Sequence, residues 1–245
     1  MIKMAVKNEK RAPRYAYIAP YRNQAKNIAW EYLKYYTHVI PGVRTNESEL
    51  FVEIPARPEF LGSAGARIYI VGADHPDALR GGYWDGVIID EYAQIKKELW
   101  DEIINPSIAD RCGWVIFVGT PKGQNQFYEI YLKAQHNKDW YTALYRAEES
   151  GVFAPGGRFG PEELARMKKD MTSLAIRQEL ECDFTASASN ILIPIDLVLQ
   201  AVGKQYREAE ISGAPCVLGI DVARFGDDSS VIVRRQGLVA YPPTV

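Results

Sequence analysis

The segment Gly86-Val87-Ile88-Ile89-Asp90-Glu91 decides the fold, because a short apolar run ends there in two carboxylates. A run of this kind is typical of a strand that is buried in a parallel sheet. Ligands of open α/β sheets bind beyond the carboxyl ends of the strands, so the pattern predicts a site at Asp90 and Glu91. One acid can hold Mg²⁺ through water, and the next can polarise an attacking water. The alternative is a structural pair of acids in the first turn of a helix, where negative charge is favourable.

Apolar strands alternate with helices around this segment. We predict strands at 15–19, 50–54, 66–71, 114–118 and 140–146, and helices at about 23–36, 92–105, 125–135, 161–181 and 196–202. Such alternation predicts a doubly wound, mostly parallel α/β sheet, in which the wholly apolar strand 114–118 is central. Residues 1–13 carry four basic side chains with little apolar pattern and are expected to be an exposed lead-in.

The composition is that of an ordinary globular protein, with 47% apolar and 24% charged residues. A net charge of -2 argues against a chain that coats nucleic acid non-specifically, so any DNA contact must come from local basic patches. Three separated cysteines and three scattered histidines disfavour disulfides, zinc and histidine metal sites. The chain has no apolar run of membrane-spanning length and no signal peptide, which predicts a soluble, intracellular protein.

Composition changes along the chain predict three parts. Residues 151–160 are rich in glycine and proline, and residues 187–190 form a small polar linker. Residues 216–221 and 230–235 are the two strands of a predicted hairpin. We therefore expect a sheet domain over 1–150, a helical linker over 151–212, and the start of another domain over 213–245.

Two further polar segments follow apolar strands. Gly119-Thr120-Pro121-Lys122-Gly123 offers the Thr120 hydroxyl to a phosphate or water, although glycine and proline also make simple turns. Asp221 ends the first strand of the predicted hairpin, which resembles the first hairpin of a ribonuclease H-like nuclease; the resemblance implies that this carboxylate binds metal ions. Asp227 or Asp228 could assist the same metal, and an Asp-rich hairpin turn is an equal alternative. A sugar-kinase or actin-like ATPase could begin with such a hairpin too.

Taken in order, these segments resemble the large terminase subunit of tailed bacteriophages. The resemblance depends on Leu79–Gly82, Val87–Glu91, Val118–Gly123, Arg177–Phe184 and Gly219–Asp221. It implies an additional-strand ATPase core, a helical linker and a ribonuclease H-like nuclease. In this family the ATPase drives double-stranded DNA into a preformed capsid, and the nuclease cuts concatemeric DNA. The implied partners are double-stranded DNA, the portal protein, the small terminase subunit and other copies in a motor ring, in the host cytoplasm.

The resemblance also implies roles for individual residues in ATP hydrolysis. Asp90 matches the Mg²⁺-linked Walker B acid, Glu91 the catalytic base, and Thr120 the motif that couples hydrolysis to DNA movement. Arg80 resembles an arginine near the γ-phosphate, where it would stabilise transferred charge; the alternative is a surface arginine. Gln24 resembles a polar nucleotide-binding residue, although an exposed helix residue is favoured there.

In the nuclease part, the resemblance implies that Asp221 and Asp228 are metal ligands. These roles would require Mg²⁺ as the cofactor, with ATP as the substrate of the first domain.

One motif of the family is missing from these 245 residues. No phosphate-binding loop of the form G-x-x-x-x-G-K-[S/T] occurs, and Gly203-Lys204 is followed by Gln205 instead of serine or threonine. The sequence therefore resembles a partial terminase that hydrolyses ATP poorly or not at all by itself. Two alternatives stay open: a superfamily-2-type helicase or translocase, and a non-catalytic chain that binds the portal or small subunit.

Overall fold

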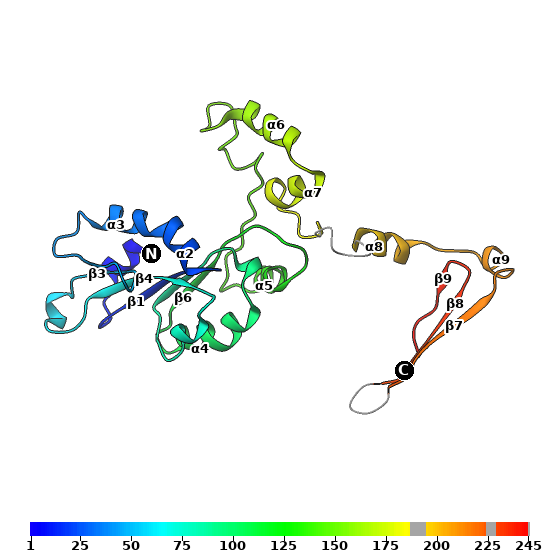
Figure 1. The fold of residues 1–245 in the computed structure, drawn as a ribbon, viewed down its shortest axis with the longest axis horizontal. Helices are drawn as coiled ribbons and strands as arrows, with labels where there is room; N and C mark the ends of the chain where they lie inside the picture. The colour runs from blue at the N-terminus through cyan, green and yellow to red at the C-terminus, as the bar shows by residue number, and fades with distance from the viewer. Residues whose placement is uncertain (187–194, 224–228, 245) are drawn as a thin grey trace. The chain divides into compact units, whose positions relative to one another are not determined.

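A computed structural model describes residues 1–186, 195–223 and 229–244. The chain divides into two compact units, Met1–Asn190 and Ile191–Val245, and each is described by itself (Figure 1). The division into domains over 1–150, 151–212 and 213–245 stays a prediction.

The first unit is built on a six-stranded sheet in the order β2-β3-β4-β1-β5-β6. Its strands are β1 (Arg14–Ala19), β2 (Arg44–Asn46), β3 (Phe51–Ile54), β4 (Ala66–Gly72), β5 (Gly86–Ile89) and β6 (Trp114–Phe117). Neighbouring strands are parallel from β4 through β1 and β5 to β6, whereas β3 is antiparallel to both β2 and β4. The predicted mostly parallel α/β sheet is confirmed.

Helical segments precede, connect and follow these strands. They are α1 (Ile2–Lys7), α2 (Arg22–Ala25), α3 (Glu31–Thr37), α4 (Asn105–Ala109), α5 (Gln126–Gln135), α6 (Gly160–Asp170) and α7 (Ser173–Ala175). π-helical turns at Lys26–Trp30, Leu99–Ile104 and Ile176–Leu180 join α2 to α3, precede α4 and follow α7. The helix predicted to end before Pro106 continues to Ala109, because proline is tolerated in the first turn of α4.

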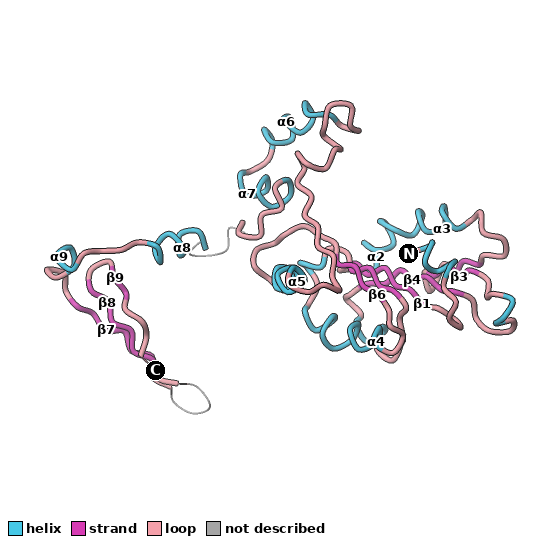
Figure 2. The backbone as a smooth tube through the Cα atoms, turned by 180° about the vertical axis from the view of Figure 1, so that it is seen from behind, coloured by secondary structure: helices cyan, strands magenta, loops and turns pink. Residues whose placement is uncertain are grey.

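Helices on both faces of the sheet bury two apolar cores. Side chains alternate along β1, so Tyr15 and Ala19 pack with Trp30 and Leu33 of the α2–α3 side. Ala16 and Ile18 point to the other face, where the core includes residues of the turn Leu99–Ile104. Figure 2 shows α2–α3 and α4 on opposite sides of the strands. Burial on both faces explains why β1 and β5 are almost wholly apolar.

Two strand predictions were wrong in part. The run Trp114–Val118 is a parallel strand, but β6 lies at the edge of the sheet, and Ile116 and Val118 are each 46% exposed. Residues 140–146 form no strand, because no described strand lies beside them to complete a hydrogen-bonded ladder. An apolar or alternating run forms a strand only when the fold places another strand beside it.

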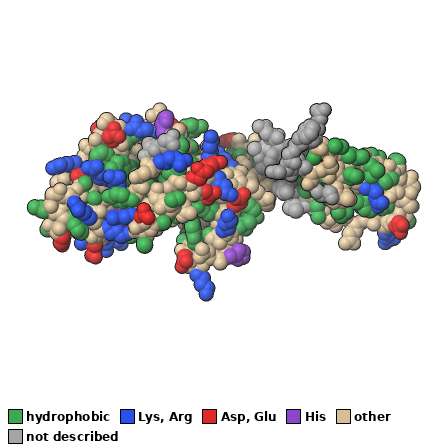
Figure 3. All heavy atoms as spheres, turned by 90° about the horizontal axis from the view of Figure 1, so that it is seen from below, with side chains coloured by type: hydrophobic (Ala, Val, Ile, Leu, Met, Phe, Trp, Pro, Cys, Tyr) green, Lys and Arg blue, Asp and Glu red, His purple; other side chains and the backbone are tan. Residues whose placement is uncertain are grey.

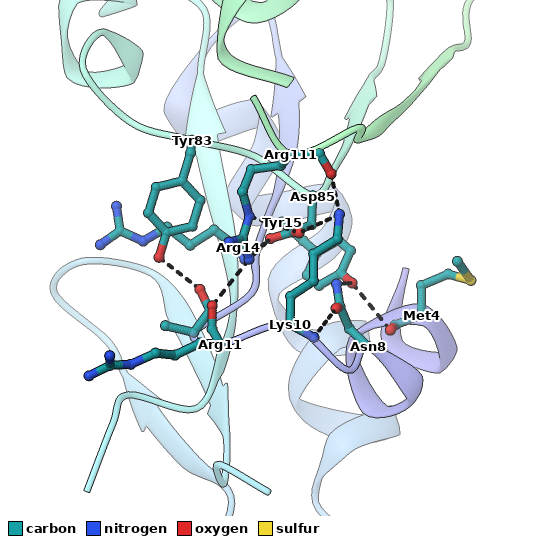
Figure 4. A network of polar contacts seen from close by, with 10 residues as sticks. Met4, Asn8, Lys10, Arg11, Arg14, Tyr15, Tyr83, Asp85 and Arg111 are labelled. Atoms are coloured by element: carbon teal, nitrogen blue, oxygen red, sulfur yellow. Dashed lines mark hydrogen bonds and ion pairs between the residues drawn. The ribbon is translucent and has the colours of Figure 1, made fainter. Parts of the chain in front are cut away.

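The N-terminal residues are in part the exposed basic lead-in that was predicted, since Lys3, Lys7, Lys10 and Arg11 are exposed, but the segment also packs on the sheet. Helix α1 buries Ala5, and Lys10 forms an ion pair of 3.4 Å with the buried Asp85 (Figure 4). Asp85 also pairs with Arg111 and accepts a hydrogen bond from the Arg14 backbone N–H. A carboxylate that is buried needs such partners, and they tie the N-terminal segment to the amino-terminal edge of the sheet.

Tyr15 gives this region a dependence on alkaline pH. Burial of the ring raises the pKa of Tyr15, whose hydroxyl accepts a hydrogen bond from Asn8 (2.7 Å) and donates to the Met4 carbonyl (3.2 Å). Because the folded-state pKa is above the unfolded value of about 10, this contribution to stability is complete below pH 10 and is lost as the pH rises further. We expect the free energy of unfolding to fall less steeply above pH 10 in Tyr15→Phe than in the wild type. Urea titrations at pH 8, 10 and 11 measure the difference; identical slopes would contradict it.

The described part of the second unit contains two helices and a small sheet. Its elements are α8 (Ile195–Gly203), α9 (Glu208–Ile211), β7 (Cys216–Asp221), β8 (Val231–Gln236) and β9 (Val239–Ala240). β7 and β8 are antiparallel, which confirms the predicted hairpin. Every residue of β7 is exposed.

The surface has mixed charge. On the face seen in Figure 3, Lys and Arg side chains are interspersed with Asp and Glu side chains over the larger unit. This agrees with the net charge of -2. No helix among the described residues has the length and apolarity that crossing a membrane requires.

Candidate active site

The candidate site lies where the parallel strands end. β1 and β5 pair in register, and the Asp90 backbone N–H continues the ladder by donating to the Ile18 carbonyl at 2.8 Å. On the other side of β5, the Val118 N–H donates to the Ile89 carbonyl at 2.9 Å. Asp90 and Glu91 therefore lie at the carboxyl edge of the sheet, between the ends of β1 and β6.

Two hydrogen bonds fix the Asp90 carboxylate. Its Oδ1 accepts the Glu91 backbone N–H at 3.0 Å, and its Oδ2 accepts the hydroxyl of Tyr17 from the neighbouring strand β1. Burial of the ring, together with the hydrogen bond to Asp90, raises the pKa of Tyr17, so the hydroxyl keeps its proton and remains a donor. Asp90 is thus half-buried and held from two directions.

Glu91 occupies a tight turn. Its backbone is left-handed (φ 51°), an uncommon conformation for a residue with a side chain. The turn Tyr92–Gln94 follows, and the Gln94 amide donates to Glu91 Oε2 at 2.9 Å. The half-buried Glu91 carboxylate is therefore oriented by a neighbour while one of its oxygens remains available.

The turn after β6 packs directly against Glu91. The Tyr92 N–H donates to the Val118 carbonyl at 3.2 Å. Gly119 has φ 153°, and a Cβ at this position would lie 3.1 Å from the Glu91 Cα and 3.2 Å from the Tyr92 N. Thr120 follows at once and is half-buried. The sequence prediction that Thr120 and the acid pair come from neighbouring strand ends thus agrees with the backbone contacts.

Replacing Gly119 by alanine is expected to push the Thr120 turn away from Glu91. The new Cβ meets the backbone of Glu91 and Tyr92 in the turn after β5, and the positive φ adds strain. We expect a loss of about 2 to 3 kcal/mol in the free energy of unfolding. Gly123→Ala is the matched control, because Gly123 also has positive φ (73°) but no atom lies within 4 Å of its Cβ position. Its loss should be only about 1 kcal/mol, and equal losses in urea titrations of the two variants would refute the contact.

Arg80 contacts an acid of the segment that precedes α4. Its guanidinium forms an ion pair of 3.4 Å with Glu102, and the two side chains are 52% and 58% exposed. Exposed pairs contribute little, about 0 to 1 kcal/mol. Breaking this one ion pair would therefore cost little.

Gln24 lies in a groove at the ends of β1 and β4. The groove has a volume of about 740 Å³ and is lined by α2 residues together with Asp74 and His75. The Asp74 carboxylate accepts the Arg22 backbone N–H at 3.3 Å. This places Gln24 at the same edge of the sheet as Asp90, with no described contact between the two.

The predicted nuclease residues lie in the second unit. Asp221 is the exposed last residue of β7 and pairs in register with Val231. Asp227 and Asp228 lie outside the described residues. Within the described ranges, no group of three or more His, Cys, Asp or Glu side chains is placed to hold a metal ion.

The acid pair at residues 90 and 91 nevertheless fits a magnesium ion that keeps most of its water. Such ions bind through one or two carboxylates together with substrate phosphates, so a three-carboxylate cluster is not required. Each Asp90 oxygen accepts one hydrogen bond from the described residues, and a carboxylate oxygen has a second lone pair with which to bind a ligand.

Sequence reasoning missed Tyr17 and Gln94. The register of β1 and β5 points to Tyr17. Tyr17 pairs with Ile88, and Asp90 lies two residues beyond Ile88 on the same face of the sheet. The sequence indicates Gln94 less clearly, only as a polar side chain one turn beyond Glu91.

Comparison with known proteins assigns the family. Residues 2–197 match the family model described as terminase large subunit, T4likevirus-type, N-terminal. Over 60 residues the chain is 50% identical to the large terminase subunits of Thermus phage G20c and Thermus virus P23-45. That stretch is 24% of this chain and spans 12% of the length of each relative.

Solved structures agree with this assignment. The ATPase domain of the Thermus phage P74-26 large terminase is 27% identical, with a TM-score of 0.52 over 71% of this chain and 78% of that chain. A large terminase of another thermophilic bacteriophage, solved with ADP, shares the fold at 11% identity, with a TM-score of 0.56 over 93% of this chain and 53% of that one. With four fifths of its length inside the matched family model, the chain belongs to the terminase large-subunit family of bacteriophages.

Proposed function

We propose that this chain supplies the acid pair of a magnesium-dependent ATPase that packages double-stranded DNA into a phage procapsid. The observation that carries the proposal is the meeting of Asp90, Glu91 and the Gly119–Thr120 turn at the carboxyl edge of one parallel sheet. A relative of the same fold was solved with ADP, which supports a nucleotide as a ligand. Portal protein, the small terminase subunit and further copies of the chain are its proposed partners in the host cytoplasm.

The position of each side chain suggests its role in ATP hydrolysis. Asp90, held by two hydrogen bonds, would bind a magnesium-coordinated water. Glu91, oriented by Gln94, would accept a proton from the attacking water and align it with the γ-phosphate. The Thr120 hydroxyl would respond to the presence of that phosphate. Bound Mg²⁺ supplies neutralising charge to the phosphate oxygens.

Two further residues have proposed roles at the nucleotide. Arg80 would leave Glu102 to stabilise the transferred charge, and Gln24 would contact the nucleotide from its groove. In the second unit, Asp221 and Asp228 are proposed ligands of the nuclease metal. Cleavage of DNA by this chain is a proposal that depends on the family alone.

Phosphate release tests the proposal. The 245-residue chain lacks the phosphate-binding loop pattern, so we expect it to release phosphate from Mg-ATP at close to the buffer rate. A strand–loop–helix segment that carries G-x-x-x-x-G-K-[S/T], joined ahead of Met1, should restore turnover, because backbone N–H groups and a lysine then hold the phosphates. We call this fusion the loop-completed chain.

The outcome separates the proposal from its main competitor. A loop-completed chain that is folded by circular dichroism, binds ATP and still shows no turnover would favour the non-catalytic reading, in which the chain only binds packaging partners. Robust turnover by the 245-residue chain alone would overturn the expectation that the loop is required.

A further inference from the structure

We propose that Tyr17 is a positioning residue for Asp90, whose carboxylate it holds in the orientation required for metal binding. This inference rests on the proposed function, since it concerns the acid that we assign to Mg²⁺. The contact between the Tyr17 hydroxyl and Asp90 Oδ2 carries it.

The strand register explains why this tyrosine reaches this acid. Tyr17 in β1 pairs with Ile70 on one side and with Ile88 on the other. Because alternate residues of a strand share a face, Asp90 extends from the same face of the sheet as Ile88. The tyrosine ring extends from β1 toward the end of β5, and its hydroxyl oxygen makes the contact with Asp90. Phenylalanine has the same ring but lacks that atom.

The Tyr17 ring packs against the apolar core of the first unit. Tyr17 is half-buried in an apolar groove of about 360 Å³ between the sheet and helices α1 and α3. The groove is lined by Ile68, Ile70, Ile88 and Tyr36, among other residues. The ring packs against the core on one side and borders the groove on another, so the hydrogen bond to Asp90 Oδ2 fixes the position of its hydroxyl.

The two bonds to Asp90 act together. The Glu91 N–H holds Oδ1, and the Tyr17 hydroxyl holds Oδ2, so rotation of the carboxylate about its last torsion is prevented. A hydrogen bond donated to a carboxylate also withdraws some electron density from its oxygens, which by itself weakens their binding to a metal ion. Orientation is the larger effect, because loss of an outer partner of a metal ligand typically reduces metal affinity by about 10- to 100-fold.

Titration with Mn²⁺ tests this role in the 245-residue chain. Electron paramagnetic resonance measures free Mn²⁺, and the wild type is compared with Tyr17→Phe, Tyr15→Phe and Asp90→Asn. We expect Tyr17→Phe to raise the dissociation constant by about 10-fold, and Asp90→Asn to remove the site. Tyr15→Phe is the matched control, since Tyr15 lies on the same strand and loses its own hydroxyl contacts with Asn8 and Met4.

The readout separates positioning from stability. Both tyrosine variants should lose about 1 kcal/mol in the free energy of unfolding, the usual worth of a hydrogen bond. Only Tyr17→Phe should also lose metal affinity. Unchanged affinity in Tyr17→Phe, with the site lost in Asp90→Asn, would refute the role of Tyr17 and leave the metal site intact. Affinity that Asp90→Asn does not change would instead refute the assignment of Asp90, and with it the proposal for Tyr17.

Discussion

Glu91→Gln in the loop-completed chain is expected to lower the rate of ATP hydrolysis by about 10²- to 10⁴-fold, the contribution of a positioned general base. Glutamine keeps the size of the side chain and can still accept the hydrogen bond that the Gln94 amide donates at 2.9 Å. It cannot accept a proton from water. Nucleotide binding, measured by the thermal shift with Mg-ATP, should therefore remain while turnover is lost.

Glu98→Gln provides the control for this experiment. Glu98 is an exposed acid further along the same connection, so its replacement changes the net charge equally without touching the strand end. Its turnover should stay within about twofold of the parent rate, as expected for a surface change. Equal losses in both variants would show that charge, and not a base at position 91, controls the rate.

Asp85→Ala is expected to produce the largest loss of stability in the first unit. The Asp85 side chain is 1% exposed and accepts the Arg14 N–H (3.0 Å) and two N–H groups of Arg111 (3.2 and 3.3 Å). Removing one member of a buried pair leaves the other charge without compensation, which costs about 3 to 5 kcal/mol. Arg111 is 24% exposed and can recover some hydration, so we expect a loss of about 3 kcal/mol.

A thermodynamic cycle with Arg111→Met isolates the pair. If the two residues act as a unit, the double variant should be no less stable than Asp85→Ala alone, because the unpaired guanidinium is also removed. Lys10→Ala is the control: its side chain is 43% exposed, and its ion pair with Asp85 should contribute less than about 1 kcal/mol. A loss below about 1 kcal/mol for Asp85→Ala, measured by urea unfolding, would contradict the buried network in Figure 4.

Local patterns predicted most of the elements. The apolar runs of β1, β4 and β5 and the alternation with helices are consequences of burial on two faces, which leaves a mark in the sequence itself. The runs at 114–118 and 140–146 show the limit of this reasoning. One became an exposed edge strand and the other no strand, because pairing depends on a neighbour that the local sequence does not contain.

The sequence by itself determined that an acid pair follows a buried strand and that a glycine-threonine turn follows another. The tertiary structure decided what each acid contacts. Asp85 and Asp90 flank the same strand β5, and no local pattern separates them. Asp85 is buried at one edge of the sheet, where it accepts hydrogen bonds from Arg111 and from the Arg14 backbone. Asp90 lies at the other edge, beside Tyr17. Partners from distant parts of the chain set the burial and the hydrogen bonds of a carboxylate, and these physical properties distinguish a structural acid from a candidate catalytic one.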